Sequence, residues 1–248
     1  MDRWRGKVAI VTGASSGMGA ALAKLLVEEG LTVVGLARRS DRVEELAKQL
    51  KCKKGKLYPL KTDISKEEDI LKAFQWTLNN LGPVHILINN AGIMSQTTLM
   101  DGDTEKWKSI FDTNVLGLCI ATREAVKIMK ANEIDGHIVH INSIAGHTVP
   151  DFPTVSVYPA SKYAVTALTE TLRKELTRAG LKIKITSVSP GVVNTEFYYS
   201  GETATTPEEM NLEFLKPEDV ANAVLYVLST PPHVQVHELT IKPIGEMF

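Results

Sequence analysis

The segment Thr12-Gly13-Ala14-Ser15-Ser16-Gly17-Met18-Gly19 joins a β-branched apolar run, residues 8–12, to a helical pattern over residues 17–29. Glycines let the backbone turn tightly and approach a ligand closely, and the N-terminus of the following helix attracts anionic groups such as phosphates. The glycine spacing is GxxxGxG, not the GxGxxG of the general dinucleotide fingerprint. Because the turn stands directly between a strand and a helix near the start of the chain, it predicts a dinucleotide-binding α/β unit.

The rest of the chain alternates short apolar runs with longer helical patterns. Strands are expected at residues 8–12, 32–36, 57–61, 86–89, 137–142, 183–189 and 238–242. Helices are expected at residues 17–29, 42–50, 66–81, 104–131, 157–179 and 217–228, with Asp41 and Glu44 as a capping box and Pro217 in a first turn. Nearly uniform apolar strands joined by helices are typical of a parallel sheet covered on both faces. The pattern therefore predicts an α/β fold with one doubly wound domain over residues 1–248.

The composition excludes several classes of function. A formal charge of −1 over 248 residues argues against nucleic acid or an anionic membrane as the main partner. No apolar run approaches the roughly 18 residues of a membrane span, and the run beginning at Lys7 leaves no room for a signal peptide. Cys52 and Cys119 form neither a disulfide framework nor a metal spacing, so we expect thiols in the cytoplasm. The histidines lack clustered carboxylate or thiol partners, so no metal is expected.

The segment Tyr158-Pro159-Ala160-Ser161-Lys162 indicates proton-transfer chemistry. Residues four apart on a helix share one face, with Cβ atoms about 5–6 Å apart. An unperturbed phenol has a pKa of ~10, and an adjacent ammonium favours the phenolate and lowers that pKa toward neutrality. Ser143 follows the apolar run at residues 138–142, so its hydroxyl is expected at the carboxyl end of a strand, where open α/β sheets bind ligands. These three side chains suit hydride chemistry on an alcohol or ketone.

Further motifs join these residues into a family pattern. The glycine-rich turn, Asn89-Asn90-Ala91-Gly92, Asn114, Ser143, the Tyr158–Lys162 segment and Pro190-Gly191 occur in this order along the chain. The sequence resembles the short-chain dehydrogenase/reductases over essentially its whole length. That resemblance implies a seven-stranded Rossmann sheet, a nicotinamide cofactor and a catalytic tetrad of Asn114, Ser143, Tyr158 and Lys162. In the family the asparagine helps hold a water linked to the lysine, and Thr195 matches a contact of the nicotinamide carboxamide.

The end of the second predicted strand indicates which nicotinamide cofactor is used. NAD-binding folds place an acidic residue there to bind the ribose 2′-hydroxyl, whereas this chain has Ala37 followed by Arg38 and Arg39. Guanidinium groups suit a 2′-phosphate, so the sequence predicts NADP(H). Asp63 matches a family residue near the adenine, although it reads equally well as a helix cap. The candidate cofactor-binding residues are Gly13, Ser15, Ser16, Gly17, Met18, Gly19, Arg38, Arg39, Asp63, Ile64, Asn90, Ala91, Gly92, Tyr158, Lys162, Pro190, Gly191, Val193 and Thr195.

The substrate is expected to contact the loops that follow residues 143 and 191. A long loop in a compact domain is often a lid, and we expect a substrate-binding insertion around residues 196–215. Its aromatic start, residues 197–199, together with Ile93, Met94, Val149 and Phe152, predicts an apolar pocket for a lipophilic, uncharged substrate.

Two terminal segments resemble one branch of the short-chain dehydrogenase/reductases in particular. Residues 1–4 and residues 237–243 are similar to the insect farnesol dehydrogenase-like branch of the family. This implies oxidation of farnesol or a related isoprenoid alcohol to its aldehyde, linked to juvenile hormone synthesis. Two alternatives remain, an NADPH-dependent carbonyl or hydroxysteroid reductase and a non-catalytic NADP(H)-binding sensor. The family also implies a homodimer or homotetramer in which the helices around 104–131 and 157–179 pair across a two-fold axis.

Overall fold

Parallel strands form the centre of the molecule in a computed structural model that describes residues 1–151, 155–199 and 213–246. Within these residues the sheet has seven strands in the order β3-β2-β1-β4-β5-β6-β7, all paired in parallel. The strands are β1 (Val8–Thr12), β2 (Thr32–Ala37), β3 (Lys56–Lys61), β4 (Val84–Asn89), β5 (His137–Ile141), β6 (Lys184–Pro190) and β7 (Glu238–Ile241). The predicted parallel, doubly wound α/β sheet is therefore confirmed.

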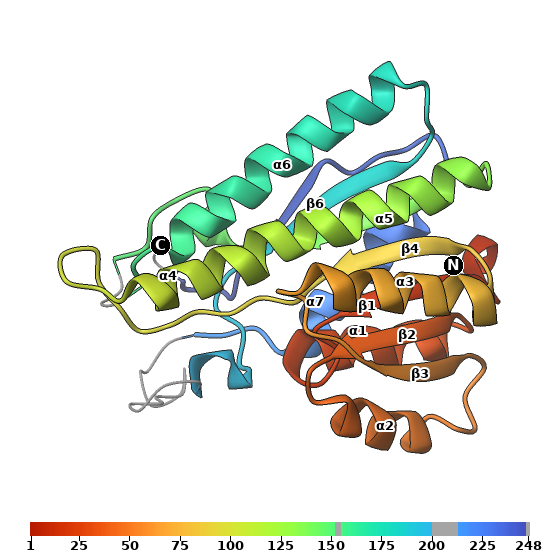
Figure 1. The fold of residues 1–248 in the computed structure, drawn as a ribbon, viewed down its shortest axis with the longest axis horizontal. Helices are drawn as coiled ribbons and strands as arrows, with labels where there is room; N and C mark the ends of the chain where they lie inside the picture. Colours follow the sequence, from red (N-terminus) through yellow and green to blue (C-terminus); the bar gives the residue numbers. More distant parts are fainter. Residues whose placement is uncertain (152–154, 200–212, 247–248) are drawn as a thin grey trace.

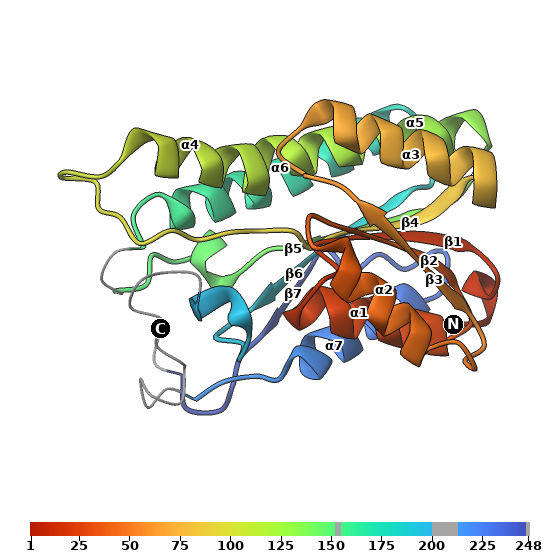
Figure 2. The ribbon, with the colours of Figure 1, turned by 60° about the horizontal axis from the view of Figure 1, so that its bottom comes forward.

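Helices cover both faces of this sheet (Figure 1). In Figure 2, α1, α2 and α7 lie on one side of the strands, and α3, α4, α5 and α6 lie on the other. Shorter turns are η1 (Asp2–Trp4), η3 (Ile144–Gly146) and η4 (Glu196–Tyr199), and η2 (Asp112–Gly117) is a π-helical segment between α4 and α5. The α-helices are α1 (Gly17–Glu28), α2 (Ser40–Gln49), α3 (Glu67–Leu81), α4 (Thr104–Phe111), α5 (Leu118–Ala131), α6 (Tyr158–Arg178) and α7 (Pro217–Ser229).

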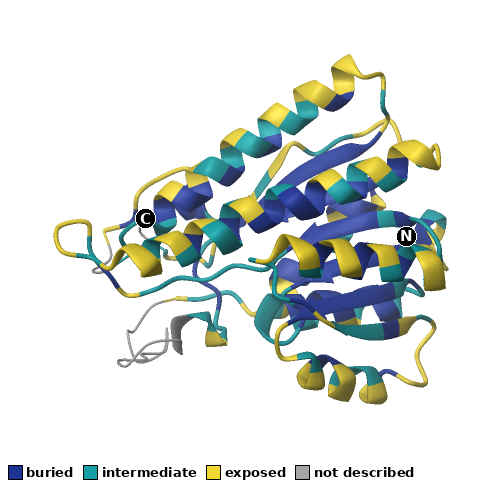
Figure 3. Cartoon of the chain, viewed as in Figure 1, coloured by how far each residue is buried: buried dark blue, intermediate teal, exposed yellow. Residues whose placement is uncertain are grey.

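The central strands β1, β2, β4, β5 and β6 are buried on both faces, because their successive side chains point to opposite layers and helices cover both layers. In β1, Ala9 and Val11 pack with the layer of α1, α2 and α7, whereas Val8 and Ile10 pack with the layer of α3, α5 and α6. Figure 3 shows the strands as the most buried part of the chain, with the outer faces of the helices exposed. The absence of polar alternation in the strand sequences follows from this double coverage.

Two details of the helices differ from the sequence-based expectation. The helix expected over 104–131 is interrupted by the π-helical segment η2, so α4 and α5 are separate α-helices. The prediction of a capping box at Asp41 and Glu44 is wrong. The helix α2 begins at Ser40 with Arg39 as its N-cap, and no side chain caps it. Pro217 does occupy the first turn of α7, as expected.

The strand order predicts a ligand cleft at the carboxyl ends of the strands. The chain runs outward from β1 to β2 and β3, and then crosses back from β3 to β4, on the other side of β1. Open α/β sheets bind ligands outside the carboxyl ends of the strands at such a reversal. Of the helices in the described residues, none is long and apolar enough to cross a membrane.

Candidate active site and nucleotide cleft

The turns that follow β1 and β4 are fastened to each other at the carboxyl edge of the sheet. The Thr12 hydroxyl accepts hydrogen bonds from the backbone N–H groups of Asn90, at 3.0 Å, and Ala91, at 2.9 Å. Gly13 has φ +69°, and a Cβ atom there would lie 2.9 Å from the Ala91 Cα. A side chain at Gly13 would therefore be strained and would push the two turns apart.

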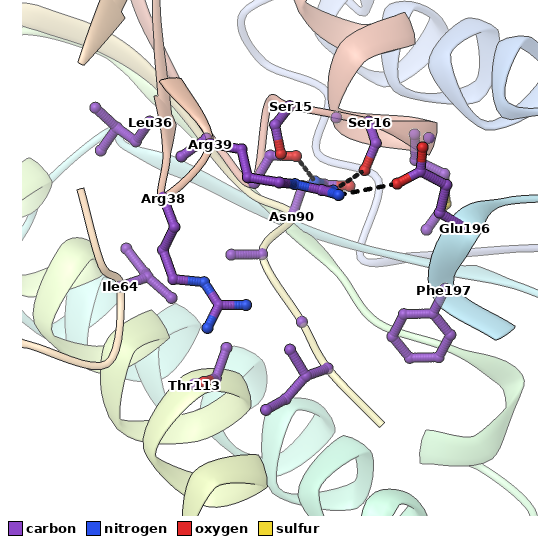
Figure 4. Close-up of a pocket in the computed structure, with 18 of the residues that line it drawn as sticks. Ser15, Ser16, Leu36, Arg38, Arg39, Ile64, Asn90, Thr113, Glu196 and Phe197 are labelled. Atoms are coloured by element: carbon purple, nitrogen blue, oxygen red, sulfur yellow. Dashed lines mark hydrogen bonds and ion pairs between the residues drawn. The ribbon is translucent and has the colours of Figure 1, made fainter. Parts of the chain in front are cut away.

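A cavity of about 520 Å³ opens above these turns (Figure 4). Its walls contain most of the candidate cofactor-binding residues, namely Gly13, Ser15, Ser16, Gly17, Met18, Gly19, Arg38, Arg39, Asp63, Ile64, Asn90, Ala91, Gly92 and Thr195. Leu36, Ala37, Thr62, Ile93, Thr113, Glu196 and Phe197 complete the lining. Tyr158, Lys162, Pro190, Gly191 and Val193 are not among the residues that line this cavity.

The cavity has the chemistry of a dinucleotide site. The N-cap of α1, Ser16, makes no side-chain capping bond, and the first turn carries no acidic residue, so the positive end of the helix dipole is uncompensated where it faces the cavity. The side-chain oxygen of Asn90 is buried and has no hydrogen-bond partner among the described residues. The N-terminus of α1 can bind the phosphates of a dinucleotide. The side-chain oxygen of Asn90 can accept a hydrogen bond from the ligand, so these residues fit a nicotinamide dinucleotide.

The two arginines after β2 point in different directions. Ala37 ends the strand as a buried residue, and both arginines are exposed. In Figure 4 the Arg39 guanidinium lies between Ser16 and Glu196, whereas Arg38 points toward the side of the cavity where Thr113 lies. Arg39 donates to the Ser16 hydroxyl at 3.0 Å and to Glu196 at 3.2 Å. The structure therefore places cationic groups at the second strand, with no acidic residue at its end.

Asp63 lines the cavity, and its side chain also stabilises the turn that follows β3. One of its carboxylate oxygens accepts from the backbone N–H of Ser65 at 3.1 Å and from its hydroxyl at 2.7 Å. Partial burial raises the pKa of Asp63, but the bonds from Ser65 and the charges of Arg38 and Lys66 lower it below its ordinary value overall. Asp63 is thus ionised, and α3 itself begins later, with Lys66 as its N-cap.

Tyr158 and Lys162 lie one helical turn apart at the start of α6. The Lys162 side chain is buried, and its Nζ donates to the carbonyl oxygen of Ile141, at the end of β5, at 3.0 Å. Burial lowers the pKa of Lys162 to about 8. A Cβ atom on Gly92 would lie 4.0 Å from this Nζ, so Lys162 and the turn after β4 are neighbours. The pair thus lies beside the nucleotide cleft.

Ser143 lies at the start of η3, and Phe197 contacts the ring of Tyr158. Ser143 is the N-cap of η3, and its hydroxyl accepts from the Ala145 N–H at 3.0 Å, which leaves the hydroxyl hydrogen able to donate. The ring of Phe197 lies 5.6 Å from the Tyr158 ring between centroids, at 59°. Because Phe197 also lines the cavity, it connects the nucleotide cleft to the tyrosine.

Asn114 lies inside the π-helical segment, a distortion that is frequent at functional sites. Its side-chain nitrogen donates to the Ile93 carbonyl at 2.9 Å and to the Ser161 hydroxyl at 3.1 Å. Its side-chain oxygen accepts from the Ile93 N–H at 2.8 Å. Both amide hydrogens are therefore engaged, and a water at this residue could only donate to it.

The Pro-Gly turn after β6 is held by the end of the chain. Gly191 N–H donates to the Ile241 carbonyl at 2.8 Å, and Val192 N–H donates to the Glu246 carboxylate at 2.9 Å. Thr195 reaches the other side of the cleft, where its methyl group would lie 3.0 Å from a Cβ on Gly17. Sequence reasoning missed both Glu246 and Glu196, since each meets its partners across distant parts of the chain.

The apolar pocket expected for the substrate is described in part. Ile93 and Phe197 line the cavity, and Met94 is half-buried. Val149 is 68% exposed and lies at the surface. Phe152 and most of the expected substrate-binding insertion, residues 200–212, lie outside the described residues.

The histidines in β5 are engaged in the core. Burial, with smaller contributions from nearby cations, lowers the pKa of both His137 and His140 to about 3, so both are neutral. His137 pairs with Thr186 at 2.9 Å, and His140 lies between Thr122 and Thr169. In the described part of the chain, no three His, Cys, Asp or Glu side chains gather where they could hold a metal ion.

Comparison with known proteins places this geometry in a family. The model of the family described as short chain dehydrogenase matches residues 7–204. The chain belongs to the short-chain dehydrogenase family. It is 54% identical to farnesol dehydrogenase of Aedes aegypti and 50% identical to dehydrogenase/reductase SDR family member 11 of Mus musculus, covering all of this chain and 100% and 98% of theirs. An alcohol dehydrogenase from Thermococcus sibiricus complexed with 5-hydroxy-NADP shares 27% identity at a TM-score of 0.86, covering 97% of this chain and 98% of that one. This short-chain dehydrogenase is therefore an oxidoreductase that acts on alcohols and binds a nicotinamide cofactor.

Proposed function

We propose that this short-chain dehydrogenase uses NADP(H) and oxidises farnesol or a related isoprenoid alcohol to its aldehyde. The observation that carries the proposal is the position of buried Lys162, which lies beside Gly92 of the nucleotide cleft and has its ammonium 5.8 Å from the centre of the Tyr158 ring. A pure binding protein has no need of a tyrosine paired with a buried lysine. This argues for turnover and against a non-catalytic sensor.

The side chains support a simple division of labour. A nicotinamide held in the cleft would provide the hydride-transfer chemistry. Tyr158 takes the proton of the substrate hydroxyl in oxidation and returns it in reduction. Lys162 stabilises the phenolate electrostatically, because its ammonium lies 5.8 Å from the centre of the Tyr158 ring. Ser143 donates a hydrogen bond to the substrate oxygen, where charge develops.

The preference for NADP(H) rests on residues of this chain. A carboxylate at the end of β2 would bind a free 2′-hydroxyl, but the strand ends at Ala37. Arg38 and Arg39 follow, and Arg39 lines the cavity next to the glycine-rich turn. Charge-assisted hydrogen bonds are worth about 1.5–3 kcal/mol each, so two such arginines would favour the phosphorylated cofactor by one to several powers of ten.

The substrate proposal rests on similarity and on the apolar wall. The Aedes aegypti relative, named farnesol dehydrogenase, aligns over the whole chain, and Phe197 and Ile93 present apolar surface at the cleft. In this reading residues 196–215 form the substrate-binding insertion, and the aldehyde product feeds juvenile hormone synthesis. Cytoplasmic residence agrees with Cys52 and Cys119, both free thiols.

We also propose a homodimer or homotetramer, with α4, α5 and α6 at the two-fold interface. These helices cover the same side of the sheet. Leu116, in η2 between α4 and α5, and Tyr163, in α6, are 51% and 43% exposed. Closed symmetric oligomers are the common outcome for soluble enzymes. Light scattering at micromolar concentration tests this, and a monomer would contradict the assembly without affecting the chemistry.

A substrate panel measured with both cofactors tests the proposed activity. The purified enzyme is assayed for kcat/KM on farnesol, geraniol, a hydroxysteroid and a short alcohol, and in reverse on farnesal, a ketosteroid and a generic dicarbonyl. Highest efficiency on farnesol with NADP⁺ supports the proposal. A strong preference for dicarbonyl or ketosteroid reduction would favour the carbonyl or hydroxysteroid reductase, and an NAD⁺ preference would contradict the cofactor assignment.

A further inference from the structure

Glu196 lines the nucleotide cleft and forms ion pairs with two arginines, Arg39 and Arg42. Its carboxylate lies 3.2 Å from Arg39 and 2.8 Å from Arg42, and both of its oxygens accept from Arg42. Arg39 and Arg42 flank the start of α2, whereas Glu196 opens η4, more than 150 positions along the chain. Figure 4 shows the carboxylate on the Arg39 side of the cavity.

The ion pair with Glu196 occupies the Arg39 guanidinium, which is the group proposed to bind the 2′-phosphate of NADP(H). Arg39 links Ser16, on the glycine-rich turn, to Glu196, so its guanidinium lies between the turn and the acidic group. A carboxylate and a phosphate ester present similar oxygens to a guanidinium fork. Glu196 therefore holds Arg39 by the same kind of contact that a ribose 2′-phosphate would make.

We propose that Glu196 is a resident competitor of the 2′-phosphate, which must displace this carboxylate from Arg39 when NADP(H) binds. The inference rests on the proposed NADP(H) preference. Arg42 lowers the cost of the exchange, since Glu196 can keep both of its bonds to Arg42 after it leaves Arg39. A nucleotide without the 2′-phosphate does not compete for Arg39, so Glu196 selectively weakens binding of the phosphorylated cofactor.

Exposure limits the size of the effect. The side chains of Arg39 and Glu196 are each 49% exposed, so water and salt screen the pair. Exposed ion pairs contribute little, and loss of this one should tighten binding of a 2′-phosphate by about twofold to fivefold at low ionic strength.

Glu196→Gln tests the inference with ligands that isolate the 2′-phosphate. The probes are 2′,5′-ADP, which carries this group, and 5′-AMP, which lacks it, with Kd measured by isothermal titration calorimetry at low and high salt. Glu45→Gln is the matched control, because it removes the same charge from an exposed pair with Lys48 on α2. We expect Glu196→Gln to bind 2′,5′-ADP more tightly than the wild type, with 5′-AMP unchanged and Glu45→Gln neutral.

The outcomes separate the inference from the proposed function. If the wild type prefers 2′,5′-ADP but Glu196→Gln leaves or weakens that affinity, Glu196 is not a competitor, although the NADP(H) preference stands. Equal tightening of both ligands would overturn the inference too, since it would show a general effect of charge. If the wild type binds 2′,5′-ADP no better than 5′-AMP, the cofactor preference is wrong and the inference falls with it.

Discussion

The ammonium of Lys162 lies 5.8 Å from the centroid of the Tyr158 ring. Both residues come from the first turns of α6, so the backbone of one helix fixes their separation. Lys162 is buried, and its Nζ donates a hydrogen bond to the carbonyl oxygen of Ile141, the last residue of β5. The sheet thus fixes the position of the charge, and the helix fixes the tyrosine relative to it.

Tyr158→Phe removes the phenolic hydroxyl and keeps the ring that packs against Phe197. We expect turnover to fall about 10²–10⁴-fold, the usual contribution of general acid–base catalysis, with cofactor affinity largely retained. Steady-state kinetics and calorimetric titration with NADP⁺ measure the two effects. Tyr163→Phe is the control, since Tyr163 lies on the same helix and is 43% exposed. Wild-type turnover in Tyr158→Phe would show that another group transfers the proton.

The pH dependence of oxidation should report the charge of Lys162. Burial lowers its pKa to about 8, so the ammonium is present below that pH and is lost as the pH rises through it. Loss of the charge destabilises the Tyr158 phenolate, and kcat/KM should therefore decline above about pH 8. Lys162→Arg keeps a cation that stays protonated throughout this range, so its residual activity should lack this decline up to pH 10. A decline with the same midpoint in both proteins would assign it to a different group.

Lys184 is expected to stabilise the fold without taking part in catalysis. Its buried Nζ donates to the Thr230 hydroxyl at 3.1 Å and to the Pro231 carbonyl at 2.7 Å, and it also contacts the carbonyl of Val234. Lys184→Met removes a buried charged donor that several oxygens share, and hydrogen bonds to charged groups are the stronger ones, so we expect a loss of about 2–4 kcal/mol in the free energy of unfolding. Urea titration at pH 7 measures it. Exposed Lys182→Met is the control, and equal stability of the two variants would contradict the argument.

The fold could be predicted, and the candidate catalytic residues could be proposed, because their signals are local. Two-sided burial leaves an uninterrupted apolar run in each central strand, and the spacing of Tyr158 and Lys162 is a property of any helix. The turn at residues 12–19 could also be predicted, because Gly13 adopts a positive φ of +69°, a conformation that residues with a side chain disfavour. Each of these features depends on neighbouring residues alone.

Most of the features that were missed depend on distant partners, and one depends on where a helix begins. The π-helical segment surrounds Asn114, whose side chain bonds to Ile93 and Ser161, and the periodicity of residues 104–131 carries no trace of those bonds. Asp41 has the spacing of a capping box, but α2 begins at Ser40 and places it inside the first turn. Glu196 reads in sequence as one acidic residue in a loop, although the fold brings it to two arginines.

Glu246 provides the last prediction, because it stabilises the Pro-Gly turn from the end of the chain. Its side chain is only 2% exposed, accepts from the Val192 N–H at 2.9 Å, and lies 3.3 Å from Lys242. A Cβ at Gly191 would lie 2.1 Å from its carboxylate, so glycine leaves the space that the carboxylate occupies. The turn at Pro190-Gly191 is a predicted cofactor contact, and loss of Glu246 should loosen it.

Glu246→Ala removes the acceptor of the Val192 N–H, and hydrogen bonds to charged groups contribute about 1.5–3 kcal/mol, so we expect a lower unfolding midpoint and weaker NADP⁺ binding. Glu246→Gln keeps an oxygen acceptor of the same reach and should recover most of the cofactor affinity, although it loses the ion pair with Lys242. Calorimetric Kd values and thermal unfolding of the three proteins measure both effects. Unchanged NADP⁺ affinity in Glu246→Ala, with stability reduced, would show that the carboxylate supports the fold and leaves the nicotinamide site unaffected.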